Sequence, residues 1–298
     1  MGKITVKDIL NKKKASEKIT MLTAYDFPLA SLIDKVGIDM ILVGDSVANV
    51  VLGLESTKQV GMAEMIHHSK AVVRGVKLSL VIGDMPFESY QIDPSQKLAC
   101  SVRNGDYPDI KNLISNGVKN AKRFIDEAGC DAVKLEWFDK CLEVAEAIIK
   151  VGIPVMGHVG LTPQTADKLG GFKVQGKDAD AANRLIQQAQ DLEKLGCFSV
   201  VLECVPDKIA EIITHKLQIP TIGIGAGINC DGQVLVTHDL LGLFERFKPK
   251  FVKQYVNLSS QIQGAVRNFK EDVTESKFPA KEHSFTIKEQ ELKKVCDE

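Results

Sequence analysis

The sequence predicts a (β/α)₈ barrel, in which a closed ring of eight parallel strands is surrounded by helices. Three observations predict it: eight short apolar segments alternate with amphipathic ones between residues 19 and 238, most of the amphipathic segments end at a glycine, and polar residues follow at least six of the apolar segments. Alternating strands and helices imply parallel pairing through right-handed crossovers. Eight such units in about 250 residues is the number found in this barrel.

A doubly wound open sheet is the alternative fold for alternating strands and helices. That fold is typically marked by a Gly-x-Gly-x-x-Gly motif after the first strand and by functional residues gathered at one switch point. No such motif follows the first strand here, and the polar strand ends are spread over at least six strands. The barrel is therefore the fold that we expect.

The first half of the chain contains a short lead-in helix and four of the expected strands. The lead-in helix lies in the lysine-rich residues 3–18, and we expect the lysines at 12–14 to be solvated surface residues. Residues 40–43 are apolar without interruption, which is typical of a strand buried on both faces. The strands expected here are residues 19–26, 40–46, 78–84 and 132–136, and the helices are residues 28–37, 62–74 and 117–128.

The second half continues the same alternation. Pro154 is compatible with a strand because it is the first residue of the apolar segment. The strands expected here are residues 154–158, 199–203, 221–227 and 234–238, and the helices are residues 139–151, 179–195, 207–217 and 250–270.

We expect residues 1–298 to form one barrel domain with two additions. Residues from about 90 to 116 are polar, contain prolines and a glycine, and lack sustained periodicity, so they are expected to form an inserted excursion. A charged segment without a core pattern begins at about residue 271 and is expected to be a polar C-terminal tail.

The composition excludes several classes of function. The chain has 298 residues, of which 44% are hydrophobic and 26% charged, and its net charge of −1 predicts no nucleic-acid partner. No apolar segment approaches the roughly 20 residues that span a bilayer, and the N-terminus lacks a secretory apolar region. The seven cysteines include no Cys-x-x-Cys pair, which predicts reduced thiols in a cytoplasmic protein.

Polar residues follow many of the predicted strands, and the carboxyl ends of all barrel strands converge on one rim. The rim set comprises Asp26, Asp45 with Ser46, Asp84, Lys134 with Glu136, His158 and Glu203. So many carboxylates would repel one another, and a divalent cation would relieve that repulsion. Oxygen ligands suit Mg²⁺, which takes one or two carboxylates together with water and substrate. The chain has no Cys/His spacing typical of a zinc site.

Several rim residues also have a structural interpretation. Asp26 precedes a Phe-Pro pair and is more readily a helix N-cap than a ligand. Lys134 and Glu136 lie on the same face of a strand and could form a buried ion pair instead of a substrate site. His158 is flanked by glycines, which we expect to allow close approach of a ligand. Glu203 ends an apolar strand, where a buried acid without a purpose would be costly.

Six motifs, in order and spread over most of the chain, together resemble the ketopantoate hydroxymethyltransferase family. Each motif alone is weak evidence for the family, but the six motifs in this order are specific for it. The motifs are Val43-Gly44-Asp45-Ser46, Gly83-Asp84-Met85-Pro86-Phe87, Val133-Lys134-Leu135-Glu136, Met156-Gly157-His158-Val159-Gly160-Leu161-Thr162-Pro163, Leu202-Glu203-Cys204-Val205-Pro206 and His238-Asp239-Leu240-Leu241-Gly242.

The resemblance implies a Mg²⁺-dependent barrel enzyme of pantothenate and coenzyme A biosynthesis. It implies transfer of a hydroxymethyl group from methylene-tetrahydrofolate, or a tetrahydromethanopterin analogue, to 3-methyl-2-oxobutanoate, giving 2-dehydropantoate. It also implies a homodecamer or another homo-oligomer.

The resemblance also implies roles for individual residues. Asp45 and Asp84 match the metal ligands, with Glu136 near the metal directly or through water, while Ser46 and Lys134 match groups that hold the keto acid. Glu203 matches the catalytic base. The predicted metal set is Asp45, Asp84 and Glu136; the predicted substrate-binding set is Asp45, Ser46, Asp84, Lys134 and His158.

The sequence departs from the family pattern in two places. Trp137 stands where the family usually has glycine, so its ring either reshapes the pocket or folds outward. Residues 91–116 are longer than the family's usual connection and border the barrel mouth.

Two other functions compete with the transferase interpretation. The first is a Mg²⁺-dependent lyase or mutase of the isocitrate lyase/phosphoenolpyruvate mutase group, whose Lys-Lys-Cys-Gly-His loop is absent here. The second is a non-catalytic barrel scaffold, which predicts loss of the rim carboxylates that this chain retains.

Overall fold

The predicted barrel is confirmed. The computed structural model describes residues 2–90, 110–165 and 173–296, so most of the expected excursion at 90–116 lies outside the described residues. Each described strand pairs in parallel with the next one along the chain, and the last pairs with the first to close the ring. The strands are β1 (Ile19–Thr23), β2 (Met40–Val43), β3 (Leu80–Asp84), β4 (Ala132–Glu136), β5 (Val155–Gly160), β6 (Ser199–Glu203), β7 (Thr221–Ile224) and β8 (Gly232–Leu235).

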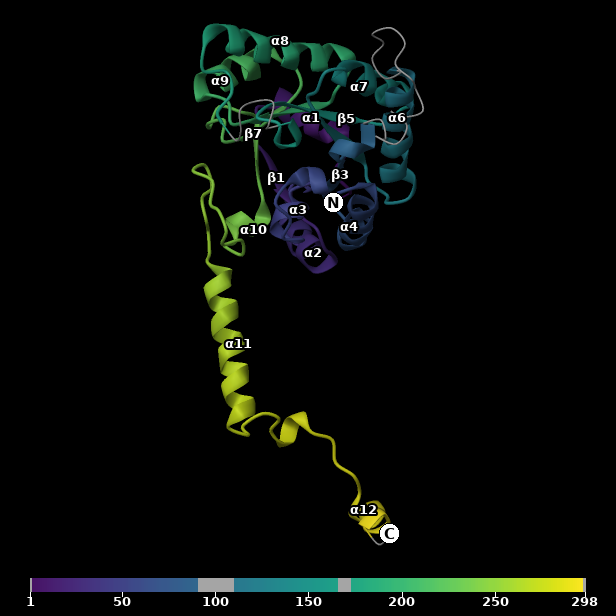
Figure 1. Cartoon of the computed structure of the whole chain (residues 1–298), viewed down its shortest axis with the longest axis vertical. Helices are drawn as coiled ribbons and strands as arrows, with labels where there is room; N and C mark the ends of the chain where they lie inside the picture. The colour runs from purple at the N-terminus through teal and green to yellow at the C-terminus, as the bar shows by residue number, and fades with distance from the viewer. Residues whose placement is uncertain (1, 91–109, 166–172, 297–298) are drawn as a thin grey trace, which may run out of the picture.

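Helices surround the barrel, and one long helix leaves it (Figure 1). The helices are α1 (Val6–Lys14), α2 (Phe27–Val36), α3 (Val47–Val50), α4 (Met62–Gly75), α6 (Ile110–Asp126), α7 (Cys141–Lys150), α8 (Ala179–Leu195), α9 (Asp207–Lys216), α10 (Thr237–Leu240), α11 (Leu258–Thr274) and α12 (Glu289–Cys296). Short 3₁₀ turns lie at Thr57–Gln59, Phe87–Tyr90 and Lys281–His283. In the part of the chain that is described, none of these helices has the length and apolar character needed to span a bilayer.

Strand β2 is buried on both faces, as the apolar run at residues 40–43 predicts, whereas β1 and β8 each have an exposed residue. All residues of β2 are buried, with Met40 and Leu42 in a cluster that fills the barrel and Ile41 and Val43 in the cluster between barrel and helices. This alternation follows from the two-residue period of a strand.

Local signals place several helix ends where the sequence predicts them. The Asp26 carboxylate accepts a hydrogen bond from the backbone N–H of Leu29 at 2.8 Å, which confirms the N-cap interpretation of Asp26. Gly37 and Gly196 end α2 and α8 in the left-handed conformation, which glycine adopts without a Cβ penalty.

Some predicted bounds are wrong. Helix α6 begins at Ile110 instead of residue 117, α11 begins at Leu258 instead of residue 250, and β8 ends at Leu235. The chain turns into α10 after β8 because Thr237 donates its hydroxyl to the carbonyl of Thr23 at 2.5 Å. This tertiary contact leaves no signal in the local apolar pattern.

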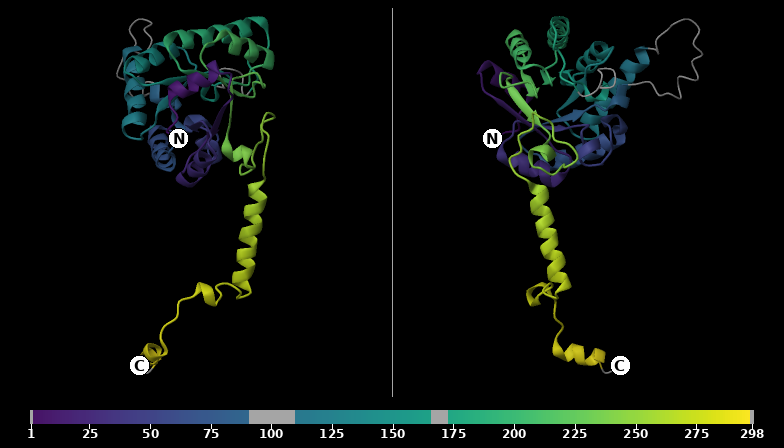
Figure 2. Two further views of the ribbon diagram at one scale, coloured as in Figure 1. Left: turned by 180° about the vertical axis from the view of Figure 1, so that it is seen from behind. Right: turned by 60° about the vertical axis from the view of Figure 1, so that its left-hand side comes forward.

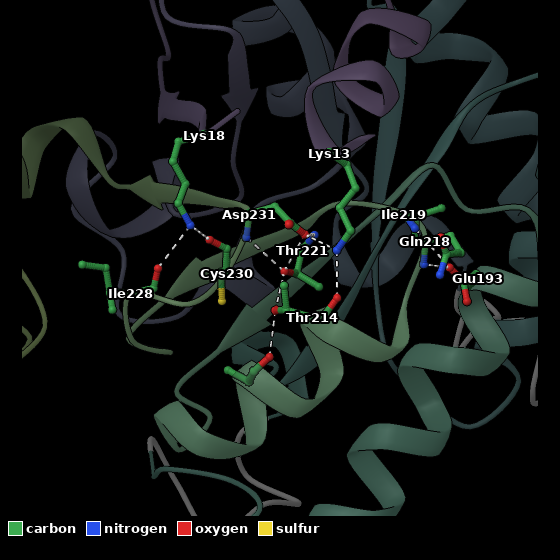
Figure 3. Close-up of polar contacts among 11 residues, drawn as sticks. Lys13, Lys18, Glu193, Thr214, Gln218, Ile219, Thr221, Ile228, Cys230 and Asp231 are labelled. Carbon is green, nitrogen blue, oxygen red and sulfur yellow. Dashed lines mark hydrogen bonds and ion pairs between the residues drawn. The ribbon is translucent and has the colours of Figure 1, made fainter. Parts of the chain in front are cut away.

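A polar cluster closes the barrel at the N-terminal ends of β7 and β8 (Figure 3). The Lys13 ammonium donates to the Asp231 carboxylate at 2.7 Å and to the Thr214 carbonyl at 2.8 Å, and the same carboxylate accepts from the backbone N–H of Thr221 at 2.9 Å. Lys13 is therefore half-buried, so the prediction of a solvated surface lysine is wrong for this residue. The paired carboxylate is the reason that the ammonium can leave water.

We expect Asp231→Ala to lower the free energy of unfolding by about 2–3 kcal/mol, because it leaves the Lys13 charge and the Thr221 N–H without their acceptor. Denaturant unfolding measures the change. Asp231→Asn keeps one acceptor oxygen and should lose less. Equal stability of wild type and Asp231→Ala would show that the cluster contributes nothing.

Candidate active site

Apart from Asp26, the predicted rim residues lie at the carboxyl ends of five neighbouring strands, β2 to β6. The strand register sets Asp84 of β3 beside Lys134 of β4, and Glu136 of β4 beside His158 of β5. The β5 residue Gly160 lies beside Glu203 of β6. Residues that are far apart in sequence are thereby aligned along one edge of the barrel.

Asp45, Asp84 and Lys134 form a buried cluster of charges. The backbone N–H of Asp45 donates to the Asp84 carboxylate at 3.1 Å, which brings the loop after β2 onto the end of β3. The Lys134 ammonium donates to both Asp84 oxygens, at 2.8 and 2.9 Å. All of these side chains are buried. The two aspartates therefore lie at the same end of the barrel, with the Asp45 backbone against the Asp84 carboxylate.

The charged chain continues from Lys134 to Glu203. The Lys134 ammonium lies 3.7 Å from a Glu136 oxygen, and the same oxygen lies 3.5 Å from Nδ1 of His158. On the other side of the ring, Nε2 of His158 lies 3.3 Å from a Glu203 oxygen. Both imidazole contacts are longer than ordinary hydrogen bonds, so charge holds the ring more than hydrogen-bond alignment does.

Burial and neighbouring charges change the ionisation of this cluster. Burial raises the pKa of the Asp45 carboxyl well above its usual range, and the Asp84 and Glu136 carboxylates raise it further. Burial alone would lower the pKa of Lys134, but Asp84 and Glu136 outweigh it and raise the pKa above its usual value. The cluster thus carries an excess of acidic groups around one permanent cation.

His158 is held in its charged form by the acids around it. Burial and Lys134 lower its pKa, but Glu136 and Glu203 outweigh them and raise the pKa to about 9. Glu203 is less buried than its strand position predicts. Its side chain remains 16% exposed at the open end of the barrel. It is the member of this chain of charges that lies nearest to solvent.

Packing requires the glycines beside His158, and their part in the approach of a ligand stays a prediction. A Cβ at Gly157 would lie 2.7 Å from the Leu192 side chain of α8. A Cβ at Gly160 would lie 2.3 Å from the Glu203 carbonyl oxygen, and Gly160 also has φ +99°. The close neighbours belong to the protein itself, namely α8 and β6.

Gln164 is a site residue that the sequence-based prediction missed. Its side chain is fully buried, and its amide donates to the Asp45 carboxylate at 2.9 Å and to the Met85 carbonyl at 3.1 Å. Its backbone N–H donates to Glu136 at 3.1 Å, and its amide oxygen accepts from the Tyr90 hydroxyl. Gln164 therefore fixes the orientation of two carboxylates. The only signal in the sequence is its position shortly after β5, and the residue carries no charge.

Ser46 has a defined partner as well. Its hydroxyl lies 2.8 Å from the hydroxyl of Tyr25, which is buried against the same loop. The contact holds the Ser46 oxygen next to Asp45, in the segment between β2 and α3. A serine that is fixed in this way can present its hydroxyl to a bound anion without losing further side-chain freedom.

The donor set fits Mg²⁺ through Asp45 and Asp84. Among the described residues, no three His, Cys, Asp or Glu side chains converge as a ready-made ligand group. Two carboxylates are nevertheless the number that Mg²⁺ usually takes from a protein, with water and substrate filling its other positions. The two oxygens of Glu136 contact Lys134, His158 and Gln164, and its place near the metal, directly or through water, stays a prediction.

The raised pKa of His158 predicts a pH-dependent stability of the metal-free protein. Since the folded pKa of about 9 lies above the unfolded value near 6.5, protonated His158 stabilises the fold. This contribution is complete below pH about 6.5 and is lost as the pH rises through about 9. The difference in unfolding free energy between wild type and His158→Gln should fall by about 3 kcal/mol over that range. A difference that is constant with pH would contradict the assignment.

Comparisons with known proteins agree with the ordered motifs. The sequence matches the family model described as ketopantoate hydroxymethyltransferase over residues 3–106 and 106–281. It is 50% identical over 295 residues to a 3-methyl-2-oxobutanoate hydroxymethyltransferase of Syntrophomonas wolfei, covering 99% of this chain and 100% of that protein. It is 52% identical over 283 residues to the protein of the same name from Syntrophus aciditrophicus, covering 95% and 97% of the two chains.

Solved structures share the fold at low sequence identity. A phosphoenolpyruvate phosphomutase from Streptomyces platensis superposes with a TM-score of 0.56 at 13% identity, covering 98% of this chain and 94% of that one. A phosphonopyruvate hydrolase in complex with oxalate and Mg²⁺ superposes with a TM-score of 0.54 at 12% identity, covering 94% and 93%. These similarities concern the barrel fold alone.

Proposed function

Because the chain belongs to the ketopantoate hydroxymethyltransferase family, we propose that its barrel mouth transfers a hydroxymethyl group from a methylene-pterin to 3-methyl-2-oxobutanoate. The product is 2-dehydropantoate, an intermediate of pantothenate and coenzyme A biosynthesis. The observation that carries the proposal is the single buried cluster in which Asp45, Asp84, Lys134, His158 and Glu203 meet. The cluster contains a carboxylate that can accept the proton from the carbon next to a ketone, and charged groups that can hold the keto acid and a metal ion.

Asp45 and Asp84 would hold Mg²⁺, and Glu136 would act from beyond them, directly or through water. When bound, Mg²⁺ supplies a Lewis acid that withdraws electron density from the ketone. Gln164 keeps the Asp45 carboxylate oriented, since its amide donates to one of the Asp45 oxygens at 2.9 Å.

Lys134, Ser46 and His158 would hold the keto acid. The raised pKa of Lys134 keeps its ammonium charged, so that it can neutralise the substrate carboxylate. The Ser46 hydroxyl is fixed by Tyr25 and adds a hydrogen bond. His158 is protonated at neutral pH and lies between Glu136 and Glu203. These groups place the C3–H bond of the substrate toward Glu203.

Glu203 would be the base. Its carboxylate would remove the proton from C3. Water would hydrolyse the methylene group of the carrier beside this carbon, breaking both C–N bonds and giving formaldehyde and the free pterin. The C3 carbanion would then form a bond to the formaldehyde carbon, and the proton held by Glu203 would pass to the formaldehyde oxygen, which becomes the new hydroxyl group. The imidazole of His158 lies 3.3 Å from a Glu203 oxygen and so helps to position the carboxylate. Partial exposure at the open end leaves Glu203 accessible to a second substrate that approaches from outside.

An assay of 2-dehydropantoate formation tests the function. We expect product from 3-methyl-2-oxobutanoate with methylene-tetrahydrofolate or with the tetrahydromethanopterin analogue, no product after chelation with EDTA, and recovery on addition of Mg²⁺. Cleavage of a 2-oxo acid without hydroxymethyl transfer would favour the lyase/mutase alternative. Absence of any turnover, with keto acid still bound, would favour the scaffold.

We also propose that the protein forms a homo-oligomer, with a decamer as the state that the family suggests. Helix α11 extends away from the barrel in both views of Figure 2 and buries none of its residues. Ile262, Val266 and Val273 are exposed along it at spacings that share one helix face. Leu32 and Val36 are also exposed on α2. A second copy of the chain supplies an apolar surface that would cover α11.

Light scattering of the full chain tests this assembly. We expect a mass of several protomers for the wild type and a smaller species for Val266→Glu, because a charge on the apolar face opposes its burial. Ser260→Glu on the same helix is the matched control. A monomeric wild type would contradict the proposal.

We place the enzyme in the cytoplasm, which is consistent with the free cysteines of the described part.

A further inference from the structure

A cavity of about 300 Å³ lies beside the barrel mouth. Its walls come from the segments that follow β4 and β5 and from the first turns of α8. The side chains that characterise it are Trp137, Phe138, Asp139, Thr162, Arg184 and Gln188. The cavity thus combines two aromatic rings with hydrogen-bonding groups of both kinds, a composition typical of sites for small organic ligands.

The cavity borders the backbone of strand ends that carry the acidic cluster. Trp137 directly follows Glu136, and its backbone N–H donates to the carbonyl of His158 at 3.0 Å. Gly160 also lines the cavity and is the register partner of Glu203. A ligand in the cavity would therefore lie beside the β5 backbone that pairs with Glu203 of β6.

The aromatic wall is built on a fixed support. The Phe138 ring stacks on Tyr90 with a centroid distance of 4.3 Å and an interplanar angle of 9°. Tyr90 is buried and donates its hydroxyl to Gln164, the residue that orients Asp45. Because these contacts hold Phe138 from behind, the wall does not need to be ordered when a ligand binds. Trp137 is half-buried and lies at the cavity instead of pointing wholly outward.

We propose that this cavity binds the pteridine ring of the one-carbon carrier, with Trp137 against the ring and Arg184 paired with the carrier's anionic tail. The inference rests on the proposed transferase function and names the site of its second substrate. Flat heteroaromatic rings stack on indole, and the amino and oxo groups of a pteridine match the Asp139 carboxylate and the Gln188 amide. Arg184 is exposed, as a group that meets a long anionic tail should be.

The keto acid does not need this cavity. It is small, and the charges that recognise it lie within the buried cluster around Lys134. The carrier, in contrast, is larger and has to bring its methylene carbon to C3 of the keto acid, beside Glu203. A site that borders Gly160 and opens outward meets that requirement.

The chain contains a single tryptophan, so tryptophan fluorescence, excited at wavelengths that tyrosine does not absorb, reports on Trp137 alone. We expect tetrahydrofolate, added without oxygen, to quench this fluorescence saturably. A control protein carries Trp137→Phe and Phe285→Trp, which moves the indole to a fully exposed position in the C-terminal segment. That control should show only the linear decrease caused by light absorption. The same titration is carried out with the tetrahydromethanopterin analogue, because it shares the pteridine ring.

Kinetics provide the second readout. Trp137→Ala should raise KM for the carrier about tenfold, because an aromatic contact of this kind contributes roughly that factor. KM for 3-methyl-2-oxobutanoate, read from Mg²⁺-dependent deuterium exchange at C3 without carrier, should change less than twofold. Trp137→Phe keeps a ring and should lie between wild type and Trp137→Ala. Arg184→Ala should weaken the binding of tetrahydrofolate. It should leave the binding of 6-methyltetrahydropterin unchanged, because that compound lacks the anionic tail.

The possible outcomes separate the two proposals. Product formation by the wild type, with no fluorescence response to either carrier, would overturn the cavity assignment and leave the function intact. The same conclusion follows if Trp137→Ala raises both KM values equally. Failure of the wild type to form 2-dehydropantoate with either carrier would instead reject the proposed function.

Discussion

Replacing Glu203 by glutamine should lower turnover by about 100-fold or more, because the amide cannot accept the C3 proton. Mg²⁺ and keto-acid binding should persist, since Asp45, Asp84 and Lys134 are unchanged. The substitution is nearly isosteric and removes one acid from the neighbourhood of His158. Steady-state kinetics and deuterium exchange at C3 of 3-methyl-2-oxobutanoate measure the loss.

The exchange experiment distinguishes the base from a merely structural acid. Glu211→Gln, a change at a half-buried glutamate on α9 that pairs with Lys208, is the matched control and should exchange like the wild type. Near-normal exchange in Glu203→Gln would reject Glu203 as the base and direct attention to His158, the other titratable group in contact with it.

Replacing Asp84 by asparagine should weaken Mg²⁺ binding by about 100-fold or more, because it removes one of two charged ligands. Calorimetric titration measures the affinity, and thermal unfolding reports separately on the fold. This second readout is needed because Asp84 also accepts two hydrogen bonds from Lys134, at 2.8 and 2.9 Å. An unchanged Mg²⁺ titration would remove Asp84 from the ligand set.

Asp45→Asn is the matched variant at the second carboxylate, which accepts from Gln164. It should lose Mg²⁺ affinity to a similar degree. Protons should compete with the cation in the wild type as well, because burial and Asp84 raise the pKa of Asp45 well above the usual range of an aspartate. Mg²⁺ affinity should therefore decline on acidification, beginning at a higher pH than exposed aspartates would cause.

The barrel was predictable because several of its strands, among them β2, β3 and β4, are buried on both faces. Each appears as an uninterrupted apolar run such as residues 40–43, and the charged rim stands out at the ends of those runs. The meeting of Asp45, Asp84, Lys134, His158 and Glu203 follows from closure of the ring, which the alternation of elements already indicates.

Other features depend on contacts between distant segments, which local patterns do not record. Thr23 ends β8 early by accepting from Thr237, and Asp231 draws Lys13 out of solvent. Gln164 was missed because charge was the criterion for a site residue. Whether Trp137 folds outward or lines a pocket depends on the shape of α8, which belongs to a different part of the chain.

A crystal of the full chain soaked in Mn²⁺ and 3-methyl-2-oxobutanoate would test whether Asp45 and Asp84 share one cation. Mn²⁺ substitutes for Mg²⁺ and is located by its anomalous scattering. We predict one strong anomalous peak in contact with both carboxylates, with the keto acid beside it. A peak elsewhere, or contact with only one of the two aspartates, would contradict the proposed mechanism.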